Sequence, residues 1–267
     1  MKAMIFAAGL GTRLRPLTDT IPKALVPVAG VPLIAHLISG LKKAGYDDIV
    51  INIYHFADMI VDYVHSMDDF GIRISFSDER NLLLDTGGGI LGARRLIEGE
   101  GSFLVHNVDI LSDVDLAAFR NAVQADSIAT LLVSRRETAR YLLFDSRMRM
   151  TGWTNVSTGQ FRSPYLPDGA AQEGSAGSFK ILHNSERYAF SGVHILSDRI
   201  FPLLGDYVEK RKRAGISCPE KFSITDFYIS FCRDAAIYGY SPEKLNVIDV
   251  GKTASLPIAE DFIRRHQ

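Results

Sequence analysis

Strand-like and helix-like segments alternate through residues 1–135 of this chain, and that alternation constrains the fold more than any single motif. Five segments have the apolar character of buried strands: residues 2–8, 48–54, 72–77, 101–109 and 128–136. Residues 32–44 and 57–67 place apolar side chains at helical spacing. Such alternation is typical of a mostly parallel sheet with helices on both faces. We therefore predict an α/β fold of the Rossmann-like type, with a mixed but mostly parallel sheet.

The second part of the chain, residues 136–267, follows a different pattern and predicts a smaller, β-rich part. The expected elements are a hairpin over 141–153, a strand at 188–196, helices near 198–213 and 223–234, a short strand at 246–250 and a final amphipathic helix through Phe262. Residues 155–187 are rich in Gly, Ser, Ala and Pro and resemble a mobile loop or lid. No hexapeptide repeat follows, so we expect a single domain over 1–267 without a C-terminal β-helix.

Composition excludes several classes of protein. With 267 residues, of which 46% are hydrophobic and 23% charged, the chain has the make-up of an ordinary globular domain. A net charge of −1 argues against a nucleic acid or an anionic membrane as the partner. No stretch approaches the roughly 18 apolar residues of a membrane span, and the apolar part of the start is too short for a signal peptide. We therefore expect a cytoplasmic protein. Its two cysteines indicate neither a disulfide framework nor a zinc site.

Residues 7–16, AAGLGTRLRP, follow the first expected strand and combine two glycines with two arginines. Glycines let the backbone approach a ligand closely and arginine side chains suit phosphate oxygens, so this loop predicts a phosphate cradle. The Walker A pattern GxxxxGK[ST] is absent. A dinucleotide fingerprint is also excluded, because Leu14 replaces the third small residue, Pro16 interrupts a helix there, and no acidic residue ends segment 48–54.

Three loops are expected to form one site. They start at Gly9, near Asp85 and at Asp109. In open α/β sheets, ligands bind outside the carboxyl ends of the strands. We therefore expect these loops to converge on a single crevice.

Four motifs occur in the order that marks the sugar-1-phosphate nucleotidyltransferases. They are AAGLGTRLRP with Pro22 and Lys23, LDTGGG at 84–89, HNVD at 106–109 and VIDVG at 247–251. The resemblance covers nearly the whole chain. Within the family the chain most resembles the short bacterial N-acetylmuramate-1-phosphate uridylyltransferases, which carry LETGGG, NGD, FSG and VDVG at comparable places; FSG stands here at 190–192. Guanylyl relatives more often read GTAG after the base loop.

The resemblance implies a fold of the nucleotide-diphospho-sugar transferase type, with a nucleotide-binding half (1–135) and a sugar-binding half (136–267). It also implies which residues meet the nucleotide. Nucleotidyl transfer is an in-line attack on the α-phosphorus, so the protein needs positioning and charge stabilisation rather than a covalent nucleophile. The backbone amides of Gly9, Gly11 and Thr12 face the β and γ phosphates, Arg13 meets the departing pyrophosphate, and Lys23 neutralises charge at the α-phosphate. The base and ribose are contacted by Ala8, Gly9, Thr86 and Gly87, with Asp109 nearby.

The same resemblance implies a Mg²⁺ site and a sugar site. Asp109 and Asp249 end two strands and would share one Mg²⁺ ion. The backbone of Ser191 and Gly192 would hold the sugar. Independently of the resemblance, Arg140 at the edge of the expected hairpin could line the sugar pocket and meet a carboxylate of the substrate. Simpler interpretations stay open for each residue: Asp109 as a helix N-cap, Asp249 as the end of a strand, Lys23 and Arg140 as solvated surface cations.

One residue departs from the family pattern. The family usually has glycine between the positions of Asn107 and Asp109, and here Val108 stands there. A β-branched residue does not easily adopt a positive φ. If the glycine served backbone flexibility, activity would be reduced; if it only packed, nothing would change.

The expected activity is the conversion of a nucleoside triphosphate and a sugar 1-phosphate into a nucleotide sugar and pyrophosphate. The favoured pair is UTP and N-acetylmuramate 1-phosphate, in nucleotide-sugar biosynthesis for peptidoglycan recycling. Guanylyl or other transfer to mannose or another hexose 1-phosphate is the first alternative. A nucleotide-binding regulator without turnover, motivated by Val108, is the second. The sequence does not decide which sugar 1-phosphate is used or whether the protein is a monomer or a homodimer. It also does not decide whether segment 155–187 is ordered.

Overall fold

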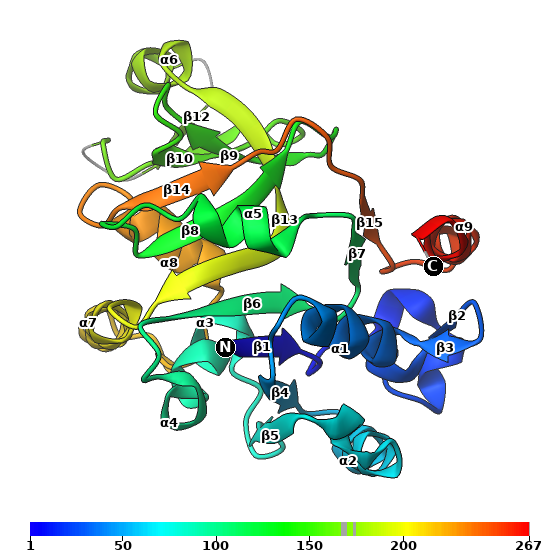
Figure 1. The fold of residues 1–267 in the computed structure, drawn as a ribbon. Coiled ribbons are helices and arrows are strands. Elements are labelled where there is room, and N and C mark those ends of the chain that lie inside the picture. Colours follow the sequence, from blue (N-terminus) through cyan, green and yellow to red (C-terminus); the bar gives the residue numbers. More distant parts are fainter. Residues whose placement is uncertain (167–169, 173–174, 267) are drawn as a thin grey trace.

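The computed structural model describes residues 1–166, 170–172 and 175–266, and its centre is a mixed, mostly parallel sheet (Figure 1). Its main strands are β1 (Lys2–Phe6), β4 (Asp48–Ile53), β5 (Arg73–Asp78), β6 (Ser102–Asn107), β8 (Ala129–Ser134), β13 (Glu186–Ser197) and β14 (Ile237–Tyr240). Strand β1 lies parallel to β4 and β6, β4 to β5, and β8 to β14, while β13 is antiparallel to β6 and β8. The predicted α/β class is confirmed.

Alternate residues of each central strand pack into two hydrophobic cores, one on each face of the sheet. In β1, Ala3 and Ile5 belong to one core and Met4 to the other. The first core is covered by α1 (Leu33–Lys43), α2 (Ala57–Ser66), α5 (Leu116–Asn121) and α9 (Leu256–His266). The second is covered by α3 (Asp85–Gly92), α4 (Arg94–Ile97), α7 (Ile200–Arg213) and α8 (Ile224–Phe231). This strict period of two explains why the strands are apolar throughout.

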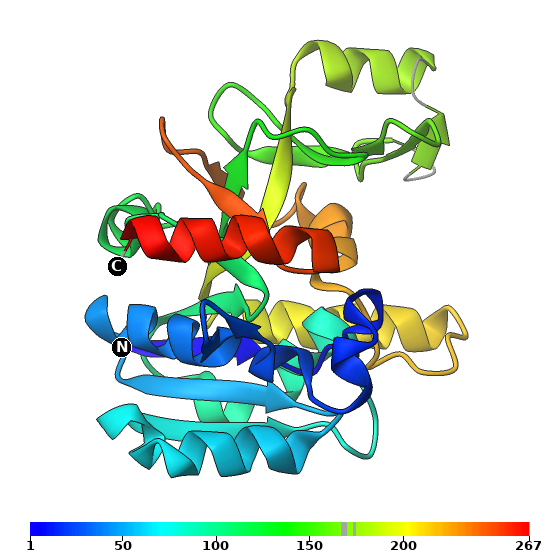
Figure 2. The same cartoon turned by 90° about the vertical axis from the view of Figure 1, so that its right-hand side faces the viewer.

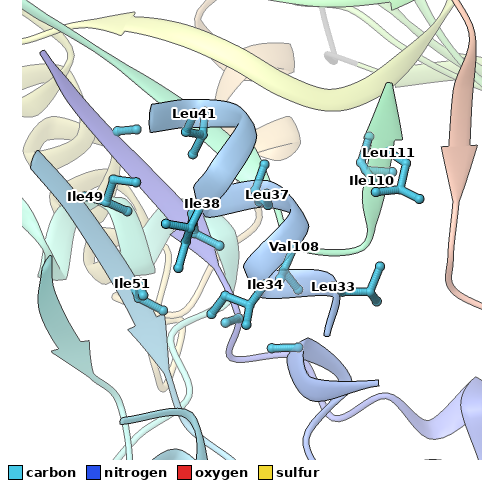
Figure 3. Close-up of a cluster of buried hydrophobic side chains, with 14 of the residues drawn as sticks. Leu33, Ile34, Leu37, Ile38, Leu41, Ile49, Ile51, Val108, Ile110 and Leu111 are labelled. Atoms are coloured by element: carbon cyan, nitrogen blue, oxygen red, sulfur yellow. The ribbon is translucent and has the colours of Figure 1, made fainter. Parts of the chain in front are cut away.

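Helix α1 shows how the predicted apolar stripe is used. Its side chains Leu33, Ile34, Leu37, Ile38 and Leu41 are buried in the first core. On the sheet they meet Ile49 and Ile51, and Val108 lies beneath the first turns of the helix. Figure 3 shows Leu33 on the side of the helix that faces Ile110 and Leu111. The helical period expected at 32–44 is therefore confirmed.

The second half adds a β-rich layer beyond β13 (Figures 1 and 2). The predicted hairpin is confirmed as β9 (Arg140–Phe144) and β10 (Met150–Asn155). The loop expected over 155–187 is wrong in its described part, which forms β11 (Gln160–Arg162), β12 (Ala170–Gln172) and α6 (Ala176–His183). Residues 167–169 and 173–174 of that segment lie outside the described residues. Strand β13 pairs with β6 and β8 of the central sheet and also with β9 of the β-rich layer. It therefore belongs to both parts of the protein.

Short elements complete the chain. They are two small sheets, β2 (Pro27–Val28) with β3 (Val31–Pro32) and β7 (Ile110–Ser112) with β15 (Val247–Asp249), and five 3-10 turns, η1 (Thr12–Leu14), η2 (Leu17–Asp19), η3 (Lys23–Leu25), η4 (Asp68–Gly71) and η5 (Thr253–Ser255). The expected loop near Asp85 is instead the start of helix α3. In the described ranges, no helix has both the length and the apolar composition needed to cross a membrane.

Candidate functional site

A cavity of about 300 Å³ opens at the carboxyl ends of the parallel strands. Its lining comes from four strand ends and one distant loop: Phe6, Ala7, Ala8, Gly9, Lys23, Asn52, Glu79, Leu83, Asp85, Thr86, Asn107, Val108, Asp109 and Lys221. The predicted convergence of the segments at Gly9, Asp85 and Asp109 is therefore confirmed. The volume suits a compact small-molecule ligand.

The loop between β1 and η3 is folded on itself around Gly11. Gly11 has φ +64, and a Cβ there would lie 2.9 Å from a methyl carbon of Thr18, so glycine is required for two reasons. The hydroxyl of Thr18 and the amide of Leu14 both donate to the Gly11 carbonyl, at 2.8 Å each. No described residue accepts a hydrogen bond from the amides of Gly9 or Gly11. These amides are available to an anion.

Lys23 and Asp109 meet inside the cavity. The Lys23 ammonium forms an ion pair with Oδ2 of Asp109, and their side chains are only 11% and 18% exposed. The alternative that Lys23 is solvated is therefore wrong. The N-cap alternative for Asp109 is also wrong, because Asp115 caps α5 by accepting from the amides of Ala117 and Ala118, at 2.9 and 3.0 Å.

Asp249 and Arg13 do not line the cavity themselves, but the residue after Asp249 is hydrogen-bonded to the backbone of Asp109. Strand β15 places Asp249 opposite Ile110, and the amide of Val250 donates to the Asp109 carbonyl at 2.8 Å. A Cβ on Gly251 would lie 2.5 Å from Oδ1 of Asp249 and 2.7 Å from Nη2 of Arg13, so both side chains approach that glycine. In the described part of the chain, no three His, Cys, Asp or Glu side chains are placed to hold a metal ion.

The LDTGGG motif packs against the segment that precedes α8. The amides of Gly87 and Gly88 donate to the Phe222 carbonyl at 2.9 and 3.3 Å, and the hydroxyl of Thr86 accepts from the amide of Ile224 at 2.9 Å. A Cβ on either glycine would come within 3.0 Å of Phe222 or of the Glu220 carbonyl. Thr86 lines the cavity, whereas Gly87 is buried against Phe222.

Three polar residues of the cavity were not selected from the sequence. The buried Glu79 carboxylate accepts from Nδ2 of Asn52 at 2.5 Å and from the amide of Leu84 at 2.8 Å. Burial raises the pKa of the Glu79 carboxyl, and these two hydrogen bonds oppose the rise. Asn52 and Glu79 stand at the ends of β4 and β5, and polar residues at strand ends were a usable signal. No pattern marks Lys221, the third of these residues.

The expected sugar-binding residues fall into two places. Ser191 and Gly192 lie at an irregularity of β13, where Gly192 has φ +75 and a Cβ would lie 2.6 Å from Nδ2 of Asn107. The Ser191 hydroxyl is buried without a hydrogen-bond partner among the described residues. Arg140 is exposed at the first residue of β9 and does not line the cavity.

Val108 keeps an ordinary backbone. It does not have a positive φ, it is 4% exposed, and its amide donates to the Phe6 carbonyl at 3.1 Å. Its side chain belongs to the core beneath α1 (Figure 3). Valine therefore fits this position without the strain that a left-handed conformation would bring.

Two histidines are buried in the sheet beside the site. Burial lowers the pKa of His106 to about 4, although its hydrogen bond to the Asn107 carbonyl opposes that shift. Burial also lowers the pKa of His194 to about 3, and the neighbouring His106 adds to the effect. Nδ1 of His194 is hydrogen-bonded to the Tyr228 hydroxyl at 2.5 Å. Both rings are neutral structural groups at neutral pH.

Comparison with known proteins gives three findings. A family model described as nucleotidyl transferase matches residues 2–141. An N-acetylmuramate alpha-1-phosphate uridylyltransferase of Neisseria meningitidis is 48% identical over 123 residues, which are 46% of this chain and 53% of that protein. A probable mannose-1-phosphate guanylyltransferase of Arabidopsis thaliana is 38% identical over 130 residues, 46% of this chain and 36% of that protein. The chain thus spans about half the length of the uridylyltransferase relatives that it matches.

The fold is also found among solved structures. A putative glucose-1-phosphate thymidylyltransferase of Bacillus anthracis superposes with a TM-score of 0.73 at 19% identity, over 99% of this chain and 95% of that one. At this identity the likeness concerns the fold. It includes the β-rich second half, which the family model does not reach.

Proposed function

Because this chain belongs to the nucleotidyl transferase family, we propose that it is a sugar-1-phosphate nucleotidyltransferase. The reaction joins a nucleoside monophosphate unit to a sugar 1-phosphate and releases pyrophosphate. The observation that carries the proposal is the meeting of Lys23 and Asp109 in a cavity that also exposes the backbone of Gly9. Cation, carboxylate and available amides are the groups that phosphoryl chemistry needs.

The proposed mechanism is a single in-line displacement. An oxygen of the sugar phosphate attacks the α-phosphorus, a new P–O bond forms, and the bond from that phosphorus to the bridging oxygen of the β-phosphate breaks. The electron pair leaves with pyrophosphate. Lys23 stabilises negative charge on the α-phosphate oxygens, and Arg13 with the amides of Gly9, Gly11 and Thr12 holds the departing pyrophosphate. No side chain forms a covalent intermediate.

The donor set beside the cavity fits Mg²⁺. This ion takes one or two carboxylates together with phosphate oxygens and water. Asp109, in the turn between β6 and β7, and Asp249, at the end of β15, would supply two carboxylates, and the Val250 amide bonds to the Asp109 carbonyl between them. When bound, Mg²⁺ supplies positive charge that polarises the phosphate. We propose Asp109 and Asp249 as its ligands.

For the substrates we propose UTP and N-acetylmuramate 1-phosphate. Support comes from the identity to the Neisseria relative and from the FSG stretch that contains Ser191 and Gly192. Ser191 and Gly192 would contact the sugar beside Asn107. Arg140 would meet the carboxylate of the muramate if the β-rich part brings it closer. Ala8, Thr86 and Gly87 would contact the base. The product would serve peptidoglycan recycling.

Transfer of a guanylyl group to mannose 1-phosphate is the alternative, because the relatives include proteins of that name. A regulator without turnover is less well supported, since Val108 fits its position without backbone strain.

The proposal is tested by pyrophosphate release from purified protein with Mg²⁺. Four nucleoside triphosphates are combined with N-acetylmuramate, glucose and mannose 1-phosphates. Release confined to UTP with the muramate is expected. Release with another single pair would keep the reaction and replace the substrates, whereas no release from any pair would overturn the proposed activity. The variant Asp249→Asn removes a proposed metal ligand. Its matched control is Asp206→Asn, which removes an exposed acid of α7. We expect roughly 100-fold loss only in the first.

A further inference from the structure

Lys23 and Asp109 are proposed to act on different parts of the substrate complex, yet in the structure they bind each other. The ammonium of Lys23 contacts Oδ2 of Asp109, and no other hydrogen bond of either side chain to a described residue is found. Both groups also line the cavity. Each charge is therefore neutralised by the other within the space that a nucleotide would enter.

The backbones of both residues are held in place, so the contact can change only through the side chains. Lys23 begins the short turn η3, where its carbonyl accepts from the amide of Val26 at 3.1 Å. Asp109 is fixed on one side by the buried Val108 and on the other by the hydrogen bond from Val250. Hydrogen bonds and packing thus hold both backbones in place. The ion pair can still be broken by rotation of the two side chains.

Asp249 and Arg13 both approach Gly251, but neither lines the cavity, and no ion pair joins their side chains among the described residues. The charge pairing inside the cavity is therefore that of Lys23 with Asp109. A neutral pair attracts neither an isolated divalent cation nor an isolated anion strongly.

We propose that Lys23 is an internal counter-ion for Asp109, and that nucleotide binding exchanges the two partners. On exchange, Lys23 turns to the phosphate and Asp109 becomes available to Mg²⁺. The inference rests on the proposed function and adds an order of events: metal and nucleotide enter together, because each relieves the charge that the other uncovers. The coupling between the two ligands is reciprocal, as linkage requires.

The exchange makes a prediction that runs against ordinary loss of a site residue. In buffer with EDTA, Asp109→Asn should bind UTP more tightly than wild type, roughly 5-fold or more, because Lys23 is released. Binding is measured by calorimetry. The control is Asp206→Asn, which removes an exposed acid of α7 that does not line the cavity. The control should change affinity by less than twofold.

A double variant separates the exchange from a general charge effect. In a Lys23→Met background, Asp109→Asn still removes a negative charge from the cavity but frees no ammonium, so it should tighten UTP binding less than in the native background. Equal tightening in both backgrounds, or in Asp206→Asn, would overturn the exchange. Unchanged or weaker binding by Asp109→Asn in the native background would also overturn it.

The metal side gives an independent readout. Lys23→Met should bind Mn²⁺ without nucleotide more tightly than wild type, as followed by electron paramagnetic resonance of the free ion. Equal Mn²⁺ affinity in the two proteins would contradict the inference. Failure of the proposed function is distinguishable: wild type would then bind no nucleoside triphosphate even with Mg²⁺, and both proposals would fall. If wild type binds nucleotide with Mg²⁺ but the variants show no exchange, only the inference falls.

Discussion

The amide nitrogen of Gly87 donates a hydrogen bond of 2.9 Å to the carbonyl oxygen of Phe222. This bond joins the start of α3 to the segment before α8, and the amide of Gly88 donates to the same carbonyl. In return, the amide of Phe222 donates to the carbonyl of Leu84 at 3.1 Å. These hydrogen bonds hold the glycine motif against a segment that is distant in the sequence. The two segments together form one wall of the cavity, to which they contribute Thr86 and Lys221.

The first prediction concerns this close approach. A Cβ on Gly88 would overlap the Glu220 carbonyl, so Gly88→Ala should lower the free energy of unfolding by about 2–3 kcal/mol. Urea unfolding measures the loss. The matched control is Gly40→Ala in α1, where a Cβ meets nothing within 4 Å; that change should leave stability unchanged or raise it by up to about 1 kcal/mol. A Gly88→Ala protein as stable as wild type would show that the two segments can separate without cost.

The second prediction concerns Val108. The side chain is 4% exposed in the core beneath α1, so Val108→Gly should cost about 2–3 kcal/mol of stability through lost packing and a freer unfolded backbone. Because Val108 carries no positive φ, the change should not raise the rate of pyrophosphate release. Thermal unfolding and a rate assay below the melting temperature check the two parts. A large gain in rate would mean that valine impairs the loop carrying Asp109.

Much of the fold was predictable because it is encoded in local periodicity. The stripe in α1 and the apolar runs of β1, β4 and β6 are each decided by neighbours a few residues away. The hairpin of β9 and β10 was predictable for the same reason. Elements decided by distant partners were not predictable. Strand β7 pairs with the distant β15, and in helix α3 Gly87 and Gly88 pack against Phe222 and Glu220 while Gly89 packs against Glu79.

The candidate site divides in the same way. Gly9, Lys23, Thr86 and Asp109 were chosen from sequence motifs, and the structure brings all four to one cavity. Lys221 was not found, because its place depends on the hydrogen bonds of its neighbour Phe222 to α3. The roles of these residues, and of Arg140, remain predictions.

The third prediction concerns Lys221 itself. It lines the cavity, and its ammonium has no hydrogen bond or ion pair with a described residue. Lys221→Met should therefore raise the KM for the nucleoside triphosphate roughly 3- to 10-fold with a smaller effect on kcat, as expected for a solvent-accessible charge contact. Lys210→Met, an exposed lysine of α7, is the control and should leave KM unchanged. Equal kinetics of Lys221→Met and wild type would remove Lys221 from the site.

The fourth prediction concerns the pH dependence of stability. Burial lowers the pKa of His194 from 6.5 to about 3, so between these pH values the ring is protonated in the unfolded chain and neutral in the folded protein. The contribution of neutral His194 to the free energy of unfolding is complete above pH 6.5 and is lost as the pH falls toward 3. At about pH 5 the loss is roughly 2 kcal/mol. Comparing urea unfolding at neutral pH and at about pH 5 should show a smaller loss in His194→Gln than in wild type.

The control for that comparison is His65→Gln, because the side chain of His65 is 57% exposed on α2. It should keep the pH dependence of wild type. If His194→Gln lost as much stability on acidification as wild type, the acid sensitivity would come from other groups.

The proposed reaction breaks the bond between the α and β phosphates of UTP. Phosphorus NMR of wild type with Mg²⁺, UTP and N-acetylmuramate 1-phosphate follows this bond, because it identifies every phosphorus product. Equal amounts of pyrophosphate and of a diphosphate diester are expected, with loss of the sugar phosphate signal. Unchanged UTP, or UDP with inorganic phosphate and an intact sugar phosphate, would contradict the proposed reaction.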